Sequence, residues 1–450
     1  MSKAVSEREL VLAVLLEVTK ENTYSHIALR GVLDKYQYLD KKERAFITRV
    51  SEGTLEHMIE IDYIINQFSK VKVNKMKPVI RNIIRSAVYQ LKYMDSVPNS
   101  AVCNEAVKLA QKKGFASLKG FVNGVLRNIA RNLDTIKYPD ESNLKDYLSI
   151  RYSMPEWILT KWLKEYDRET VEKMLQDFQS EKPTTIRCNL HKLSVEELIQ
   201  KLESEQVKVE RHPYLPYALE ISEYNYLGEL QSFQDGDFTI QDISSMMVSE
   251  IADPKKEDYI IDVCAAPGGK SLHLADKLDG SGHVEARDLT AYKVELIQEN
   301  IKRTGMTNIE AVLQDATVFD LASKEKADLV IADIPCSGLG VLGKKTDLKY
   351  KASPEEIQNL VCLQREILKT VHTYVKPGGI LLYSTCTISR EENMDNVEWF
   401  LKEYPKFRLA DIKPNLCEEL KQAVIQEGCI QFLPGVQQSD GFFIAKFIRG

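Results

Sequence analysis

The chain has 450 residues, of which 44% are hydrophobic and 28% are charged, and its formal net charge is −6. This length exceeds what one compact core usually holds, so two or three globular domains are expected and disorder is excluded. No apolar run reaches the roughly 18 residues of a membrane span, and the first residues carry no export signal. A cytoplasmic protein without membrane association is therefore predicted.

The charge is unevenly distributed along the chain. Residues 1–140 contain 23 lysine and arginine residues against 15 carboxylates, and residues 68–131 contain 13 against 2. The remainder of the chain is acidic. A basic region joined to an acidic one indicates that a polyanion is held mainly by the first.

The first 135 residues follow a helical pattern. Apolar residues recur at helical spacing, Pro78 is placed to start a helix, and a last helix is predicted over 118–133. The break at Val97-Pro98 predicts Asn99 or Ser100 as the cap of the next helix. Because strand alternation is missing, an all-helical domain is predicted for residues 1–137.

Residues 138–235 are predicted to form a linker and a small α+β module that binds RNA. A helical pattern covers 144–178, a strand is expected at 184–189, a short helix at 195–202, and strand-like alternation runs through 207–233.

Residues 236–450 change to strand–helix alternation, which predicts a Rossmann-like, doubly wound α/β domain with a largely parallel sheet. A terminal hairpin is expected from 428–433 and 440–447. The predicted strands of the main sheet are 259–264, 283–286, 309–313, 327–332 and 379–383.

A loop of small residues follows the first of these strands directly. It lets a nucleotide-like ligand approach the backbone at a helix N-terminus, although it is neither a Gly-x-Gly-x-x-Gly turn nor a Walker loop. Acids close the next three strands, at the edge where such sheets bind ligands, and an acid about 20 residues past the loop suits a ribose diol. The loop is Cys264-Ala265-Ala266-Pro267-Gly268-Gly269-Lys270, and the acids are Asp288, Asp315 and Asp333.

Two of the eight cysteines lie in motifs of their own. Cys336 is in Ala-Asp-Ile-Pro-Cys-Ser-Gly, and Cys386 is in Tyr-Ser-Thr-Cys-Thr. No Cys-x-x-Cys pair or Cys/His spacing appears, so neither a metal site nor a disulfide framework is predicted. The cysteines without motif context are expected to be small buried residues, namely Cys103, Cys188, Cys362, Cys417 and Cys429.

Taken together, the glycine loop, Asp288, Asp315 and the two cysteine motifs closely resemble those of the RNA cytosine-5 methyltransferases that use S-adenosylmethionine. The helical N-terminal region resembles the NusB-type RNA-binding fold. A NusB-like region followed by this catalytic domain resembles the domain layout of the 16S rRNA methyltransferases of the RsmB/Sun/Fmu type. The resemblance implies methyl transfer to C5 of a cytosine in 16S rRNA, before the subunit is fully assembled.

The resemblance also implies roles for individual residues. Cys386 would add as a thiolate to C6 of the cytosine, Asp333 would support the addition by hydrogen bonding, and Cys336 would assist product release. No metal is needed. The cofactor would be held by Cys264, Ala265, Ala266, Pro267, Gly268, Gly269, Lys270, Asp288, Asp315 and Asp333, with help from Lys293.

One segment departs from the family pattern. Relatives often carry Arg-Arg-x-Pro-Asp after the Pro-Cys motif, whereas this chain has Gly-Lys-Lys-Thr-Asp at 343–347. The positive charge is kept but the proline is missing, which leaves the shape of this loop open.

Two alternatives stay open from the sequence. The same chemistry could act on tRNA, although a NusB-like extension implies a larger structured RNA. The chain could instead be a NusB-like RNA-binding factor with an inactive methyltransferase domain, against which the intact cysteines, Asp333 and glycine loop argue. A monomer is expected, because no heptad seam is visible.

Overall fold

The computed structural model of this chain describes residues 5–36 and 38–450. Contacts divide it into two compact units. The first runs to Ser180 and also takes in Leu342–Lys351, and the second consists of Glu181–Val341 and Ala352–Gly450. Within the described ranges, no helix is long and apolar enough to cross a membrane. The domain boundaries expected after residues 137 and 235 stay predictions.

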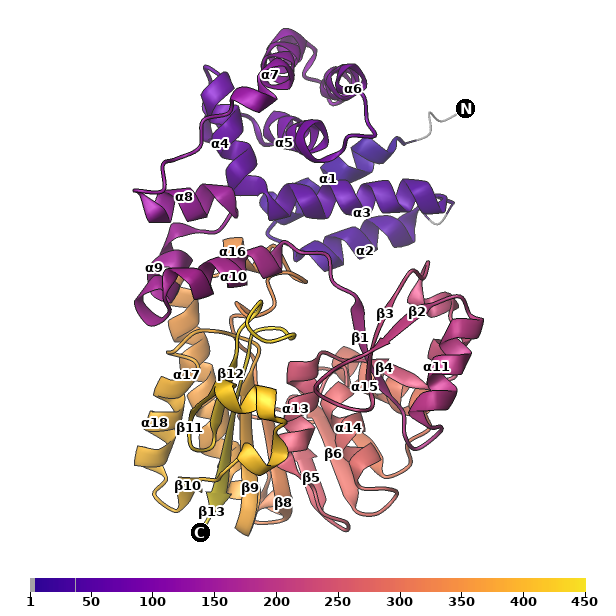
Figure 1. The fold of residues 1–450 in the computed structure, drawn as a ribbon, viewed down its shortest axis with the longest axis vertical. Helices are drawn as coiled ribbons and strands as arrows, with labels where there is room; N and C mark the ends of the chain where they lie inside the picture. The colour runs from indigo at the N-terminus through magenta and orange to yellow at the C-terminus, as the bar shows by residue number, and fades with distance from the viewer. Residues whose placement is uncertain (1–4, 37) are drawn as a thin grey trace. The chain divides into compact units, whose positions relative to one another are not determined.

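The first unit is built from helices, as predicted (Figure 1). Its core is an apolar cluster to which α1 and α3 to α7 contribute most of the buried residues. The helices are α1 (Glu7–Thr19), α2 (Ser25–Lys35), α3 (Lys41–Glu56), α4 (Met58–Phe68), α5 (Pro78–Tyr93), α6 (Asn99–Lys112), α7 (Lys119–Arg131), α8 (Leu144–Arg151), α9 (Glu156–Glu165), α10 (Arg168–Phe178) and the short α16 (Leu348–Lys351).

Two helix starts were predicted from local sequence, and the structure confirms one of them. Helix α5 begins at Pro78, which confirms the prediction, since proline lacks the N–H that a first helical residue leaves unpaired anyway. The predicted cap of α6 is wrong. Asn99 is already the first helical residue, and Pro98 occupies the cap position. The proline ring fixes φ near the −59° observed there, and no side-chain hydrogen bond caps the helix.

The segment Leu342–Lys351 packs among the N-terminal helices. Buried Asp347 accepts hydrogen bonds from the Ser25 N–H (3.0 Å) and hydroxyl (2.6 Å). Lys349 Nζ donates to the Glu56 carbonyl and Tyr350 OH to the Leu55 carbonyl, both over 2.8 Å. Burial lowers the pKa of Lys349 to about 7. The loop whose shape the sequence left open is thus anchored in the helical unit and ends in α16.

The second unit starts with a small antiparallel sheet of order β2-β3-β1-β4, flanked by two helices. The strands expected over 207–233 end early, because Leu227, Leu230 and Phe233 pack on this sheet at helical spacing. The elements are β1 (Thr184–Cys188), α11 (Val195–Ser204), β2 (Lys208–Arg211), β3 (Ala218–Ser222), α12 (Gln231–Gln234) and β4 (Phe238–Ile240).

A larger sheet follows, in the order β11-β12-β13-β9-β8-β5-β6-β7, with β10 paired to β13. Strands β5 to β9 run parallel, and β12, β13 and β9 pair antiparallel, which confirms the predicted α/β fold and terminal hairpin. The strands are β5 (Tyr259–Asp262), β6 (His283–Asp288), β7 (Ile309–Leu313), β8 (Ala327–Asp333), β9 (Val375–Thr385), β10 (Phe407–Leu409), β11 (Val424–Gln426), β12 (Cys429–Phe432) and β13 (Phe442–Arg449). The helices are α13 (Ile243–Ala252), α14 (Gly269–Lys277), α15 (Ala291–Thr304), α17 (Pro354–Val371) and α18 (Met394–Glu403) (Figure 1).

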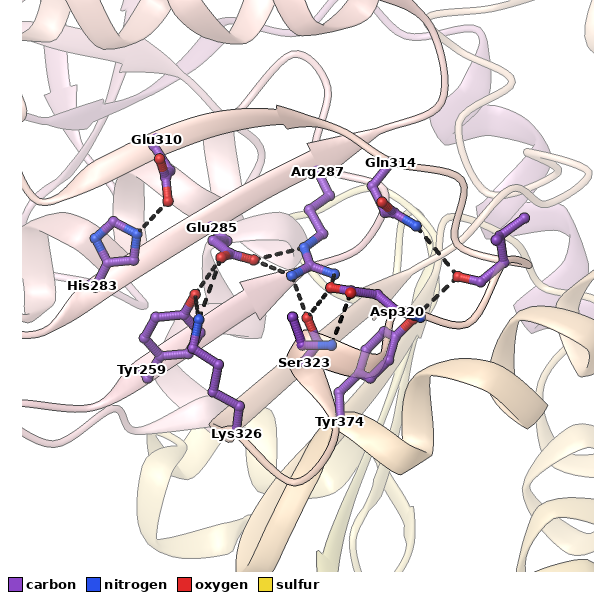
Figure 2. Close-up of polar contacts among 12 residues, drawn as sticks. Tyr259, His283, Glu285, Arg287, Glu310, Gln314, Asp320, Ser323, Lys326 and Tyr374 are labelled. Atoms are coloured by element: carbon purple, nitrogen blue, oxygen red, sulfur yellow. Dashed lines mark hydrogen bonds and ion pairs between the residues drawn. The ribbon is translucent and has the colours of Figure 1, made fainter.

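A buried charge network fastens β6 to its neighbours (Figure 2). The Arg287 guanidinium pairs with Glu285 on the same strand and donates to Ser323 Oγ over 2.6 Å. Burial pushes the pKa of Glu285 up, but hydrogen bonds from Tyr259 and Arg287 outweigh it and leave this pKa lowered. Because successive side chains alternate across a strand, this network holds one face of β6 while Asp288 faces the other.

We predict that Arg287→Met lowers the local unfolding free energy of β6 by about 3 kcal/mol, because Glu285 would stay buried without its main cation. Native-state hydrogen exchange of the β6 amides measures this. Lys326→Met is the matched control, since the half-exposed Lys326 contacts the same Glu285 at 3.8 Å and should cost less than about 1 kcal/mol. Equal losses in the two variants would contradict the prediction.

Candidate active site

The glycine loop connects β5 to α14. Gly268 caps α14 in a left-handed conformation (φ 104°) and donates from its N–H to the Ala265 carbonyl over 2.7 Å. A side chain at Gly268 would be strained in this conformation, so the tight turn requires glycine. Burial raises the pKa of Cys264 well above its usual range, so this thiol stays protonated. Cys264 is therefore part of the loop's wall and is not a nucleophile.

Asp288 lies at the end of β6, next to the glycine loop. Its carboxylate accepts hydrogen bonds from the backbone N–H groups of Ala266 (3.0 Å) and Leu289 (2.7 Å) and pairs with Lys293 Nζ at 3.0 Å. The structure thus brings Asp288 and the loop together. Asp315 hydrogen bonds within its own loop, accepting from the N–H (2.8 Å) and hydroxyl (2.7 Å) of Thr317.

A buried acid, Asp262, lies under the loop at the end of β5. One of its oxygens accepts a hydrogen bond from Ser271 Oγ over 2.6 Å, and the other has no partner among the described residues. Burial, helped by the nearby charge of Asp333, raises the pKa of Asp262 to about 7. An unsatisfied buried oxygen beside a glycine loop fits a polar ligand that completes its hydrogen bonding.

Asp333 and Lys270 form an ion pair, with Nζ 2.6 Å from Oδ2. The other oxygen of Asp333 accepts from Ser384 Oγ over 2.8 Å. Burial lowers the pKa of Lys270, but attraction to Asp333, Asp262 and Cys386 outweighs this and raises it, so the ammonium is retained. Lys270, expected from sequence to contact the cofactor, is thereby placed as the partner of Asp333.

The two motif cysteines meet at one edge of the sheet. Strands β8 and β9 pair in parallel with Asp333 opposite Ser384, so the loops after them start side by side. The sulfur atoms of Cys336 and Cys386 are 3.2 Å apart. The hydrogen bond to Cys386, burial and the charges of Cys386 and Glu392 raise the pKa of Cys336 well above its usual range.

The C-terminal hairpin closes over these loops. Gly340 donates from its N–H to the Cys386 carbonyl over 3.1 Å, and Gly441 donates to the Gly340 carbonyl over 2.8 Å. A Cβ on Gly340 would lie 1.9 Å from the Gly441 oxygen, so the two backbones approach as closely as only glycine permits.

Of the remaining cysteines, Cys103, Cys188 and Cys429 are buried as predicted, and Cys417 is partly buried. The prediction for Cys362 is wrong. This residue is exposed, because it follows the buried Val361 on α17 and so lies on the outer side of that helix.

Sequence reasoning missed a set of buried polar side chains below the cysteines. Glu392 is fully buried and hydrogen bonds to residues of both cysteine loops. Glu392 is in the run Ile-Ser-Arg-Glu-Glu-Asn that follows Cys386 and shares the family resemblance, but polar runs usually lie on solvated surfaces, so no buried role was predicted for it.

A parallel sheet with a glycine loop after one strand and an acid at the end of the next is an arrangement that S-adenosylmethionine-dependent methyltransferases share with dinucleotide-binding folds. Family models identify the first of these classes. The chain matches "16S rRNA methyltransferase RsmB/F" over residues 249–448, the "NusB family" over 5–131, and a ferredoxin-like domain of RsmF/B-like methyltransferases over 154–225.

Curated relatives cover the full length. The chain is 35% identical to the "Probable ribosomal RNA small subunit methyltransferase B" of Bacillus subtilis over 99% of both chains. It is 31% identical to the protein of that name from Synechocystis, over 98% of this chain and 99% of the other. The chain belongs to the RsmB family of methyltransferases.

Solved structures agree with this fold. The crystal structure of PH0851 superposes with a TM-score of 0.82 at 26% identity and covers 99% of both chains. A methyltransferase homologue from Pyrococcus horikoshii gives a TM-score of 0.58 at 25% identity, over 67% of this chain and 98% of the other.

S-adenosylmethionine is the cofactor of this family, and the residues at the glycine loop fit it. The loop is tight and bordered by small residues, while the unpartnered Asp262 oxygen and the carboxylate of Asp288 supply acceptors for amino and hydroxyl groups. We predict that the loop 264–270, Asp262 and Asp288 hold it, and the contacts expected from Asp315 and Asp333 stay predictions.

We predict that Asp262→Asn stabilises the ligand-free protein more at pH 8 than at pH 5, by about 3 kcal/mol. The folded-state pKa of Asp262, about 7, lies above its unfolded value, so wild-type stability falls as pH rises through this interval. Hydrogen exchange of the β5 amides at both pH values measures the difference. The exposed Asp279→Asn is the control, and an equal change with pH in both variants would contradict the prediction.

Proposed function

We propose that this protein transfers a methyl group from S-adenosylmethionine to C5 of a cytosine in 16S rRNA, through a covalent bond between Cys386 and C6. The observation that carries the proposal is the pair of sulfur atoms, 3.2 Å apart, beside the Asp333–Lys270 pair. A methyl transfer to an oxygen or nitrogen needs no thiol nucleophile, whereas an unactivated C5 carbon does.

Cys386 is the nucleophile in this proposal. The Lys270 ammonium interacts electrostatically with Cys386 and favours its thiolate. The thiolate adds to C6 of the cytosine, and the π electron pair of the C5–C6 double bond shifts onto C5 and is delocalised through C4 to N3, so C5 becomes nucleophilic. Asp333 accepts a hydrogen bond from the exocyclic amine of the base and, once it carries a proton, donates one to N3, which stabilises the negative charge that reaches N3.

Bound S-adenosylmethionine supplies an electrophilic methyl group, which C5 accepts. A base then takes the C5 proton, and the C6–sulfur bond breaks with its electrons returning to Cys386. Cys336 assists this release from its place beside the leaving sulfur.

We assign rRNA binding to the helical unit, with the unassembled 16S rRNA as substrate and a cytoplasmic monomer as the acting form. A hollow of about 470 Å³ lies between α6 and α7, within the basic region, and carries no carboxylate in its lining. It is lined by Asn104, Val107, Lys108, Lys119, Gly120, Asn123 and Arg127. Cations and amides along an open groove suit an RNA backbone.

We predict that Cys336→Ala protein, incubated with S-adenosylmethionine and protein-free 16S rRNA, accumulates a protein–RNA adduct that survives a denaturing gel. Release is slowed while addition continues, so the adduct builds up. The double variant Cys336→Ala/Cys386→Ala is expected to form none. An adduct that persists without Cys386 would overturn the assignment, and an adduct with tRNA but not with 16S rRNA would overturn the substrate.

We further predict that Lys119→Ala/Arg127→Ala weakens 16S rRNA binding and reduces the slope of log affinity against log salt by about 1 to 2, because two phosphate contacts are lost. Cofactor binding is expected to be unchanged. Titrations at several salt concentrations measure this.

The control for this pair is Lys20→Ala/Arg30→Ala, which removes the same charge from the C-cap of α1 and from α2, where both cations are in exposed ion pairs. If both double variants reduce the salt slope equally, the effect belongs to net charge, and the groove is not the RNA site.

A further inference from the structure

Glu392 lies between the loops that carry the two cysteines. Its side chain is fully buried. Oε1 accepts from the Ser337 N–H over 2.8 Å, and Oε2 accepts from the Ser337 hydroxyl over 2.5 Å and from the Thr387 hydroxyl over 3.4 Å. Ser337 directly follows Cys336, and Thr387 directly follows Cys386. One carboxylate thus links the neighbours of both sulfur atoms.

Further buried side chains complete this link. The hydroxyls of Ser337 and Thr387 are 2.7 Å apart. Gln364 on α17 donates to Glu392 Oε1 over 3.1 Å and to the Pro335 carbonyl over 2.9 Å, so the residue before Cys336 is held as well. The Asn393 amide donates to the Thr387 carbonyl over 3.1 Å. The chain is therefore fixed on both sides of Cys336 and immediately after Cys386.

The charge of Glu392 is not required for packing. The partners described above are neutral donors, and burial raises the pKa of this carboxyl group. A buried carboxylate costs free energy that a neutral residue would not. A glutamine could keep these contacts only if both hydroxyls turned from donating to accepting from its amide nitrogen. The acid thus carries a desolvation cost that packing does not require, which points to a function for the charge.

We propose that Glu392 is a positioning residue that holds the two cysteine loops together and keeps Cys336 a thiol, so that Cys386 alone is the thiolate. This inference rests on the proposed covalent mechanism. The titratable groups that face Cys336 are Cys386 after β9, Glu392 before α18 and Tyr383 on β9. A negative charge at Glu392 disfavours a second one on Cys336, while Lys270 attracts the charge on Cys386.

The test measures charge and position separately in the full-length protein. In a Cys386→Ala background, the rate at which iodoacetamide alkylates Cys336 is followed against pH by mass spectrometry of its peptide. Glu392→Gln is expected to move the midpoint of this profile to lower pH. Glu391→Gln, one residue away and hydrogen bonded to Ser389, is the matched control and should leave it in place. An unchanged midpoint in Glu392→Gln would overturn the proposal.

With both cysteines present, Glu392→Gln should lower kcat about 100-fold, with KM for S-adenosylmethionine unchanged, because the reacting groups lose their alignment. Glu392→Asp keeps the charge but shortens the side chain, so it should lower kcat without moving the alkylation midpoint. If Glu392→Gln does not fold, Ser337→Ala is measured instead and should behave as Glu392→Asp does. A midpoint that moves with Ser337→Ala or Glu392→Asp would overturn the role of the charge.

The alkylation profile needs neither RNA nor methyl transfer. If C5 methylation is not found while the midpoint still moves, the proposed function fails and the electrostatic role of Glu392 stands. If methylation is found and the midpoint does not move, the positioning proposal fails alone.

Discussion

The parallel pairing of β8 with β9 is the constraint on which the site depends. The register that sets Asp333 opposite Ser384 brings together two chain segments that are 50 residues apart in sequence. The acid, its lysine partner and both sulfur atoms then lie at one sheet edge. A shift of one residue would turn Asp333 to the opposite face and separate it from Ser384. Sheet register is thus a chemical requirement here as well as a structural one.

The buried charges of the second unit fall into two groups, one that stabilises the sheet and one that lies at the candidate site. The network around Arg287 holds β6 from one face, while the acids that face the glycine loop lie at the strand ends. Lys270 is the cation that interacts with Asp262, Asp333 and Cys386, whereas Glu392 hydrogen bonds to the residue after each motif cysteine. Opposite charges at one sheet edge can bias two chemically identical thiols toward different protonation states.

Much of this could be predicted from the sequence because the signals are local. Apolar periodicity located the strands of the main sheet, and carboxyl ends of parallel strands located Asp288, Asp333 and the glycine loop. The part played by Lys270 as the partner of Asp333 was not foreseen, since it depends on the first turn of α14 meeting the end of β8.

What the sequence could not predict depends on distant pairs. Glu392 reaches Ser337 across 55 residues, and nothing near either residue indicates the partner. Residues 227–234 alternate like a strand, yet their apolar positions pack at helical spacing on a sheet formed elsewhere. The predicted caps of α6, Asn99 or Ser100, lie one or two residues after the observed cap Pro98, because these residue types are the usual caps and proline is not.

The packing of Leu342–Lys351 among the N-terminal helices has a consequence for how such a protein could have arisen. The chain passes between the two units three times, so neither unit is a contiguous stretch of sequence. A single recombination event at a linker would leave Asp347, Lys349 and Tyr350 without the helices that satisfy them. The helical unit and the methyltransferase unit are therefore expected to be inherited together rather than exchanged as separate modules.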